Sequence, residues 1–258
     1  MVRKIELQPA YVLHTREYRD TSLLVDFLTL DYGLVRAVAR GVRGGKSQKR
    51  ALLQPLQPLL VSMSGRSELL TMGAMEPAAP VFQLHGERLF SVLYLNEILC
   101  RLLQSGQSHP EIYRLYQTTL VSLLNHSLIE IVLRRFEYRL LLELGYGPDL
   151  TIDASTGNAV LADQHYLFDP QFGLKLCDEI RNNPQANRFH GQQLIKMNQL
   201  LSSDHEFKEN KPLLSDAKRF MRQALRPLLG IKPLNSRQLF ISANSSTVNN
   251  LPQVHDNR

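Results

Sequence analysis

Residues 33–50 read GLVRAVARGVRGGKSQKR, and this stretch decides how the first part of the chain is expected to fold. With the two-residue period of a strand, Val35, Ala37 and Ala39 share one face and are small and apolar enough to pack in a core. The other face carries Leu34, Arg36, Val38 and Arg40. After Arg40 the alternation stops, and glycines appear among basic residues with no carboxylate from residue 33 to residue 50. The pattern predicts a strand that runs into a flexible, positively charged loop.

A strand with arginines on one face, followed by such a loop, is a candidate clamp for the phosphate backbone of a nucleic acid. The alternative is a solvated hairpin loop whose lysines only keep the protein soluble. The whole chain favours a polyanionic partner, because its 258 residues carry a net charge of +6 and its pI is about 9.4.

Composition narrows the class of protein. Hydrophobic residues make up 43% and charged residues 21%, as in ordinary globular proteins. Two cysteines, Cys100 and Cys177, are too few for a disulfide framework or a four-thiolate zinc site. The opening residues MVRKIELQPA lack the apolar core of a signal peptide, and no apolar run is long enough to span a bilayer. We therefore expect a cytoplasmic protein that makes no membrane contact.

The chain is expected to be an α+β protein. Five short strands are predicted at 11–16, 22–29, 34–40, 59–63 and 68–74, separated by turn-forming residues. Five short strands in about seventy residues fit a closed barrel of the oligonucleotide-binding (OB) type. We assign residues 1–78 to this barrel, because the prolines at 77 and 80 end regular strand pairing.

A helical domain is predicted over residues 79–240. Helical periodicity occurs at 81–104, 108–124, 127–144, 192–201 and 215–229. Between them lies a loop-rich insertion at about 149–190, with two possible short strands at 159–161 and 174–176. The polar residues 241–258 have no periodicity and are expected to form a flexible tail.

No catalytic motif is evident. Gly45-Lys46-Ser47 looks like the end of a phosphate-binding loop, but Arg40 stands where that motif needs a glycine, and the following residues do not suggest the required helix. The sequence Asp204-His205-Glu206 occupies a polar segment and is more typical of a solvated loop. We expect no enzyme activity; a phosphate-loop nucleotidase and an RNA-binding OB module remain as alternatives.

Two helices carry candidate binding residues. In 127–144, Arg134 or Arg135 could bind a partner's carboxylate, although pairing with glutamates one turn away also explains them. In 215–229, basic residues recur at four-residue intervals opposite an apolar face, which suits nucleic acid or an acidic partner. These residues are Lys218, Arg222 and Arg226, with Arg219 beside them.

The order of several motifs resembles the RecO family of bacterial recombination mediators. AYVLH at 10–14, TSLL at 21–24, GLVR at 33–36 and ARGVR at 39–43 are similar to its amino-terminal barrel. YLNE at 94–97 and LRRFE at 133–137 are similar to its helical domain, and ALRPLLG at 224–230 with KPLNSR at 232–237 to its closing motif.

The resemblance implies binding of single- and double-stranded DNA, annealing of complementary strands and no catalytic site or cofactor. It also implies that, with RecR, the protein helps to load RecA onto strands covered by single-stranded-DNA-binding protein. The implied DNA-binding residues of the barrel are Arg36, Arg40, Arg43, Lys46, Lys49 and Arg50. In LRRFE, Arg134 is the position implied for the acidic carboxyl-terminal tail of the covering protein, with Arg135 beside it.

One departure concerns metal binding. Many family members bind zinc through two Cys-x-x-Cys pairs after a Gly-Tyr-x-Pro turn. In this chain Asp153 and Thr156 stand at the first pair, and Cys177 alone remains near the second. A tetrahedral thiolate site cannot form from these residues. We therefore expect a metal-free and more loosely held insertion.

Overall fold

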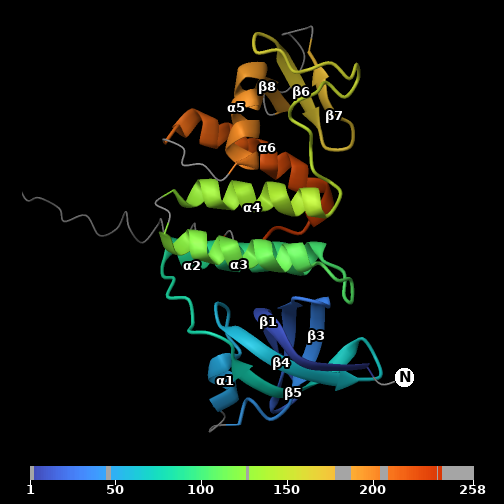
Figure 1. Ribbon diagram of the computed structural model, residues 1–258, viewed down its shortest axis with the longest axis vertical. Coiled ribbons are helices and arrows are strands. Elements are labelled where there is room, and N and C mark those ends of the chain that lie inside the picture. Colours follow the sequence, from blue (N-terminus) through green and yellow to red (C-terminus); the bar gives the residue numbers. More distant parts are fainter. Residues whose placement is uncertain are drawn as a thin grey trace, which may run out of the picture. The chain divides into compact units, whose positions relative to one another are not determined.

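The computed structural model describes residues 3–44, 48–125, 128–177, 187–203, 209–236 and 238–239. They pack into two compact units. One unit holds the described residues up to Ser108 together with those from Lys232 onward, and the other holds His109–Ile231. Elements are labelled in Figure 1. The predicted tail at 241–258 lies outside the described residues.

The first unit contains a closed five-stranded barrel, as predicted (Figure 1, blue to cyan). Its strands are β1 (Arg3–Tyr18), β2 (Ser22–Thr29), β3 (Gly33–Ala39), β4 (Pro58–Gly65) and β5 (Leu69–Pro77). The order around the barrel is β1-β2-β3-β5-β4. The long β1 pairs with both β2 and β4, and irregularities in its register let it bend between them. Only β3 and β5 run parallel to each other.

The predicted inward face of β3 is confirmed, because Val35, Ala37 and Ala39 belong to the buried barrel core. The outer face is covered too. Leu34 and Val38 are buried, and the Leu34 carbonyl accepts a hydrogen bond from the Gly106 N–H at 3.1 Å. The outer side of β3 is therefore partly a packing surface and not simply a surface for ligands.

Two helices belong to the barrel unit. The short α1 (Gln48–Leu52) follows the basic loop, where no helix was predicted. The longer α2 (Glu87–Leu102) packs against β1, and the Asn96 amide donates to the Leu13 carbonyl at 3.1 Å. Packing thus groups α2 with the barrel, while the barrel strands themselves end at Pro77. The predicted domain boundaries at residues 78 and 240 concern which parts of the chain can fold independently, and they remain predictions.

The second unit contains four helices among the described residues and a small sheet. The helices are α3 (Pro110–Asn125), α4 (Ile129–Glu143), α5 (Gly191–Ser202) and α6 (Lys211–Leu229). The strands are β6 (His165–Asp169), β7 (Gly173–Leu176) and β8 (Arg188–His190), in the order β7-β6-β8. Aromatic contacts join sheet and helix, because the Phe220 ring of α6 lies 4.1 Å from that of Phe168 and 5.3 Å from that of Phe189. The α+β class, a barrel followed by helices, is confirmed.

The described part of the insertion, residues 149–177, contains strands and hydrogen bonds beyond those predicted. The predicted strand at 174–176 is part of β7, whereas 159–161 contributes only an isolated bridge between Ala159 and Ile152. Asp153 is buried, and its carboxylate accepts hydrogen bonds from the Ser155 N–H at 2.8 Å, the Ser155 hydroxyl at 2.6 Å and the Leu176 N–H at 3.4 Å. A buried carboxylate therefore connects Ser155 and Leu176 within the segment that was expected to be loosely held.

Candidate nucleic-acid interface and partner pocket

The basic loop after β3 is fastened to the β1–β2 turn by Arg43. Its Nη1 donates to the Arg19 carbonyl at 3.1 Å, and its Nη2 pairs with the Glu17 carboxylate at 2.9 Å. The Arg43 backbone N–H also donates to the Thr21 carbonyl at 3.0 Å. Both terminal nitrogens of this guanidinium thus contact the protein itself.

Arg36 is paired as well. Asp26 lies directly across from it in the β2–β3 ladder, and the Arg36 Nε to Asp26 Oδ1 distance is 2.6 Å. The Asp26 side chain is only 13% exposed. Both charges act on the Cys100 thiol of α2, although burial is the main reason that the pKa of Cys100 is raised to about 12. Arg36 is therefore engaged by Asp26 within the barrel.

Three other predicted barrel residues are exposed to solvent. Arg40, Lys49 and Arg50 form no ion pair with any residue in the part of the chain that the structure describes. Lys46 lies outside the described residues. The exposed Arg16 and Arg19 sit on the β1–β2 hairpin that Arg43 holds, and the sequence analysis did not select them. The alternation of residues along β1 could have suggested Arg16. The contacts between Arg43 and this hairpin, however, could be recognised only in the folded structure.

Helix α6 divides its four predicted basic residues into two pairs. Lys218 Nζ lies 2.7 Å from Glu130 of α4. Arg219 pairs with Asp216 at 2.9 Å, donates to the Arg188 carbonyl and lies 4.2 Å over the Phe189 ring. Arg222 and Arg226 are exposed and have no ion-pair partner among the described residues. Only this second pair is available for a polyanion without breaking an existing contact.

The two arginines of the LRRFE motif make different contacts. Arg134 is 6% exposed, and its Nη2 pairs with the fully buried Glu137 at 2.8 Å. Arg135 is also buried, and its Nε donates to the Leu200 carbonyl at 2.9 Å. Arg135, unlike Arg134, lines a pocket between α3 and α4.

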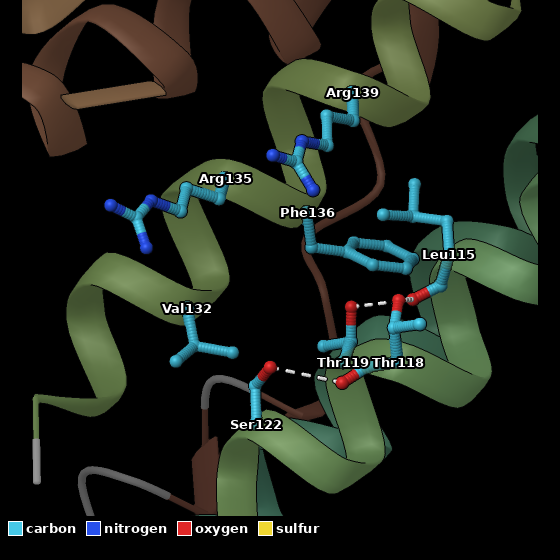
Figure 2. Close-up of a pocket in the computed structure, with 8 residues that line it drawn as sticks. All are labelled: Leu115, Thr118, Thr119, Ser122, Val132, Arg135, Phe136 and Arg139. Atoms are coloured by element: carbon cyan, nitrogen blue, oxygen red, sulfur yellow. Dashed lines mark hydrogen bonds between the residues drawn. The ribbon is translucent and has the colours of Figure 1, made fainter. Parts of the chain in front are cut away.

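That pocket has a volume of about 250 Å³ and combines two arginines with an apolar wall (Figure 2). Its lining residues are Leu115, Thr118, Thr119, Ser122, Val132, Arg135, Phe136 and Arg139. Arg139 is a basic pocket residue that the sequence analysis did not select. Its position one helical turn after Arg135 was the signal that could have identified it. The hydroxyls of Thr118, Thr119 and Ser122 donate to carbonyls of their own helix. The three hydroxyls are thus used within α3, and no lining residue is acidic.

The described residues form neither a metal centre nor a phosphate-binding loop. Within the described ranges, no group of three or more His, Cys, Asp or Glu side chains is placed to hold a metal ion. Residues 45–47 and 204–206 lie outside those ranges. The helix α1 does follow Gly45-Lys46-Ser47, contrary to expectation, but it has only five residues, and Arg40 still replaces the glycine of the motif. No described helix is long and apolar enough to cross a membrane.

Comparison with known proteins covers nearly the whole chain. The family described as "Recombination protein O N terminal" matches residues 3–81, and that described as "Recombination protein O C terminal" matches residues 83–238.

Three similar proteins share one name. A "DNA repair protein RecO" from Pseudoalteromonas atlantica is 45% identical over 89% of this chain and 92% of its own length. Proteins of that name from Actinobacillus pleuropneumoniae and Coxiella burnetii are 40% and 38% identical over 90% and 93% of this chain, and over 93% and 99% of their own lengths. The chain therefore belongs to the RecO family of DNA repair and recombination proteins.

Proposed function

We propose that the protein is a DNA-binding recombination mediator without a catalytic site. It binds single- and double-stranded DNA, anneals complementary strands and, with RecR, helps to load RecA onto strands covered by single-stranded-DNA-binding protein. It works in the cytoplasm, at the nucleoid. The observation that carries this proposal is the set of exposed cations without ion-pair partners among the described residues, at the end of β3 and in α1. They are Arg40, Lys49 and Arg50.

The mechanism is charge neutralisation. Each phosphate that meets a lysine or arginine releases condensed counterions, which favours binding at low salt. Two strands bound on cationic surfaces repel each other less, so complementary bases can pair. No covalent bond is made or broken in this scheme. The family membership and the exposed arginines of α6, Arg222 and Arg226, support the same role.

Salt dependence tests the assignment of the barrel residues. We expect the triple change Arg40→Glu, Lys49→Glu, Arg50→Glu to weaken binding of a labelled single strand and to flatten its salt dependence. The slope of log K against log salt should fall by about 0.7 for each lost phosphate contact. Fluorescence anisotropy at several salt concentrations measures this slope.

A variant with the same change in net charge is the matched control. Arg114, Lys175 and Lys211 are exposed cations of the second unit, and their replacement by glutamate should leave the slope nearly unchanged. Equal slopes in both triple variants would reject the barrel assignment. Annealing is measured separately, as quenching between complementary strands labelled with donor and acceptor. Competition with a ribo-oligonucleotide of the same sequence tests the RNA-binding alternative through the 2′-hydroxyl groups.

The α3–α4 pocket is the proposed site for the acidic carboxyl-terminal tail of the covering protein. Arginine forks bind carboxylates through two parallel hydrogen bonds, and the apolar wall around Phe136 can receive an apolar side chain of the same peptide. We assign the contacts to Arg135 and Arg139, because both line the pocket. Arg134 is assigned a supporting role, since its buried ion pair with Glu137 holds the helix segment that carries Arg135.

Peptide binding tests this assignment. Arg139→Ala should weaken binding of a labelled tail peptide about tenfold, as expected for the loss of one charge-assisted contact. Arg114→Ala removes an exposed arginine of α3 that does not line the pocket, and should leave peptide affinity unchanged. DNA affinity should be the same in both variants. A peptide that binds both equally well would exclude the pocket.

A further inference from the structure

The turn between β1 and β2 presents an aromatic ring beside an arginine. Tyr18 is the last residue of β1 and is half-buried, while Arg19 is exposed. The Arg19 Cζ atom lies 5.3 Å from the centre of the Tyr18 ring. The φ angle of Arg19 is 52°, in the left-handed backbone region that residues other than glycine rarely adopt. Such a conformation persists only where the surrounding structure holds it.

Arg43 supplies that support. Its side chain binds the Arg19 carbonyl and the Glu17 carboxylate, and its backbone N–H binds the Thr21 carbonyl. One residue therefore holds the turn on both sides of its tip. The neighbouring Arg40 has no such internal contact among the described residues and remains exposed.

Resting on the DNA binding proposed above, we propose that Tyr18 and Arg19 form a stacking platform for an unpaired nucleobase of single-stranded DNA. Arg43 is the positioning residue that holds this platform. An aromatic face stacks on any base, and an arginine plane adds a cation–π contribution. The charge needed for the adjacent phosphates is close by, because Leu23 pairs with Ala39 and so brings the turn next to Arg40.

The platform also predicts a preference. The bases of a duplex are already stacked on one another and cannot lie on the Tyr18 ring without unpairing. The basic residues, by contrast, bind the backbone of either form. The platform should therefore strengthen binding of single strands and leave binding of duplexes unchanged. Because it holds no phosphate, it should not affect the salt dependence.

The chain contains no tryptophan, so Tyr18→Trp introduces a single reporter at the platform. Addition of oligo(dT) at low salt should quench its fluorescence. Tyr32→Trp is the matched control, because Tyr32 also lies under an arginine, with the Arg3 Cζ atom 5.0 Å from its ring, but in the turn at the other end of β2. We expect at least twofold stronger quenching at position 18 than at position 32.

The outcomes separate the two proposals. Equal quenching at both positions, or none at position 18 while anisotropy records binding, would overturn the platform and leave the DNA-binding proposal standing. No binding of DNA by the unaltered protein would overturn both.

Affinity gives a second measurement that does not depend on the tryptophan variants. Tyr18→Ala should weaken single-strand binding about tenfold, within the range reported for loss of one stacked base, whereas Tyr18→Phe should retain it. Duplex affinity and the salt slope should not change in either. An equal loss of duplex affinity in Tyr18→Ala would overturn the platform.

Arg43→Gln, made in the Tyr18→Trp protein, tests the positioning role. It should reduce the amplitude of quenching without changing the salt slope, because Arg43 acts on the turn and not on a phosphate. A flatter slope with full quenching would show that Arg43 is a phosphate contact and would overturn its positioning role.

Discussion

Glu97 and Ser236 are joined by two hydrogen bonds although 139 residues separate them in the sequence. One Glu97 carboxylate oxygen accepts from the Ser236 N–H at 2.9 Å and from its hydroxyl at 2.8 Å. The other accepts from the Asn235 N–H at 3.0 Å and pairs with Arg101 at 2.6 Å. Arg101 also donates to the Lys232 and Pro233 carbonyls. This cluster binds the returning segment at 232–236 to α2.

Glu97→Gln should lower the free energy of unfolding by about 1–3 kcal/mol, because a partly buried network loses its charged acceptor. Burial alone would raise the pKa of Glu97, but the hydrogen bonds from Ser236, Asn235 and Arg101 outweigh it, and the net shift is downward. A lowered pKa stabilises the fold above the pKa of the unfolded chain, and this stabilisation disappears as the pH falls through the folded value. Urea unfolding from pH 7 to pH 3 measures both effects.

The control for this experiment is Glu111→Gln. Glu111 pairs with Arg114 at the exposed surface of α3, where ion pairs contribute little. We expect no measurable change in stability or in the way stability decreases between pH 7 and pH 3. If Glu97→Gln also left that decrease unchanged, the charge of Glu97 would not stabilise the fold.

Asp153→Asn should loosen the insertion, because it removes the charge that holds Ser155 and Leu176. Burial raises the pKa of Asp153, but hydrogen bonds from Ser155 and Leu176 lower it further than burial raises it. The carboxylate therefore stabilises the insertion near neutral pH, and this contribution is lost as the pH falls through the lowered pKa. Amide hydrogen exchange at Leu176 should become about tenfold faster, corresponding to roughly 1–2 kcal/mol.

Asp163→Asn serves as the comparison, because Asp163 is exposed in the same insertion. Exchange at Leu176 should be unaffected by it. Equal exchange rates in both variants would show that the Asp153 carboxylate does not connect the two halves of the insertion.

Arg36→Ala and Arg40→Ala should affect two different properties of the protein, its stability and its binding of DNA. The first leaves the largely buried Asp26 without its ion-pair partner, so the free energy of unfolding should fall by about 1–3 kcal/mol. It should leave the salt slope of DNA binding unchanged. The second should flatten that slope by about 0.7 and leave stability within roughly 0.5 kcal/mol. Chemical unfolding measures the stability of both variants, and fluorescence anisotropy measures the salt slope of their DNA binding. A flatter slope for Arg36→Ala would show that Arg36 contacts a phosphate.

A parallel comparison applies to α6. Arg219→Ala removes a cation–π contact with Phe189 and the bonds to Asp216 and to the Arg188 carbonyl, so we expect a loss of about 2 kcal/mol in thermal or urea unfolding. Arg222→Ala should leave stability unchanged and weaken DNA binding, since its side chain is exposed. Equal stabilities for the two variants would show that the Arg219 contacts contribute nothing to the fold.

Much of the architecture could be predicted from local pattern. Alternation located the strands of the barrel, and the positions of Val35, Ala37 and Ala39 in its core followed from the strand period alone. Periodicity likewise located the helices of the second unit. The helix α1 was missed because its five residues are too few to show a period. The contact between Asp153 and β7 could not be predicted, because it joins a carboxylate to a strand 23 residues later in the chain.

The sequence by itself determined the barrel, the longer helices, the excess of positive charge and the family to which the chain belongs. Only the tertiary structure decided which cations remain available to a ligand. Arg36 and Arg40 lie on the same face by alternation, yet Asp26 on the adjacent strand pairs with the first and nothing described pairs with the second. Lys218 likewise meets Glu130, 88 residues away. An ion pair forms between neighbours in space, and a periodic pattern along one strand or helix contains no information about the opposite charge that folding brings to it.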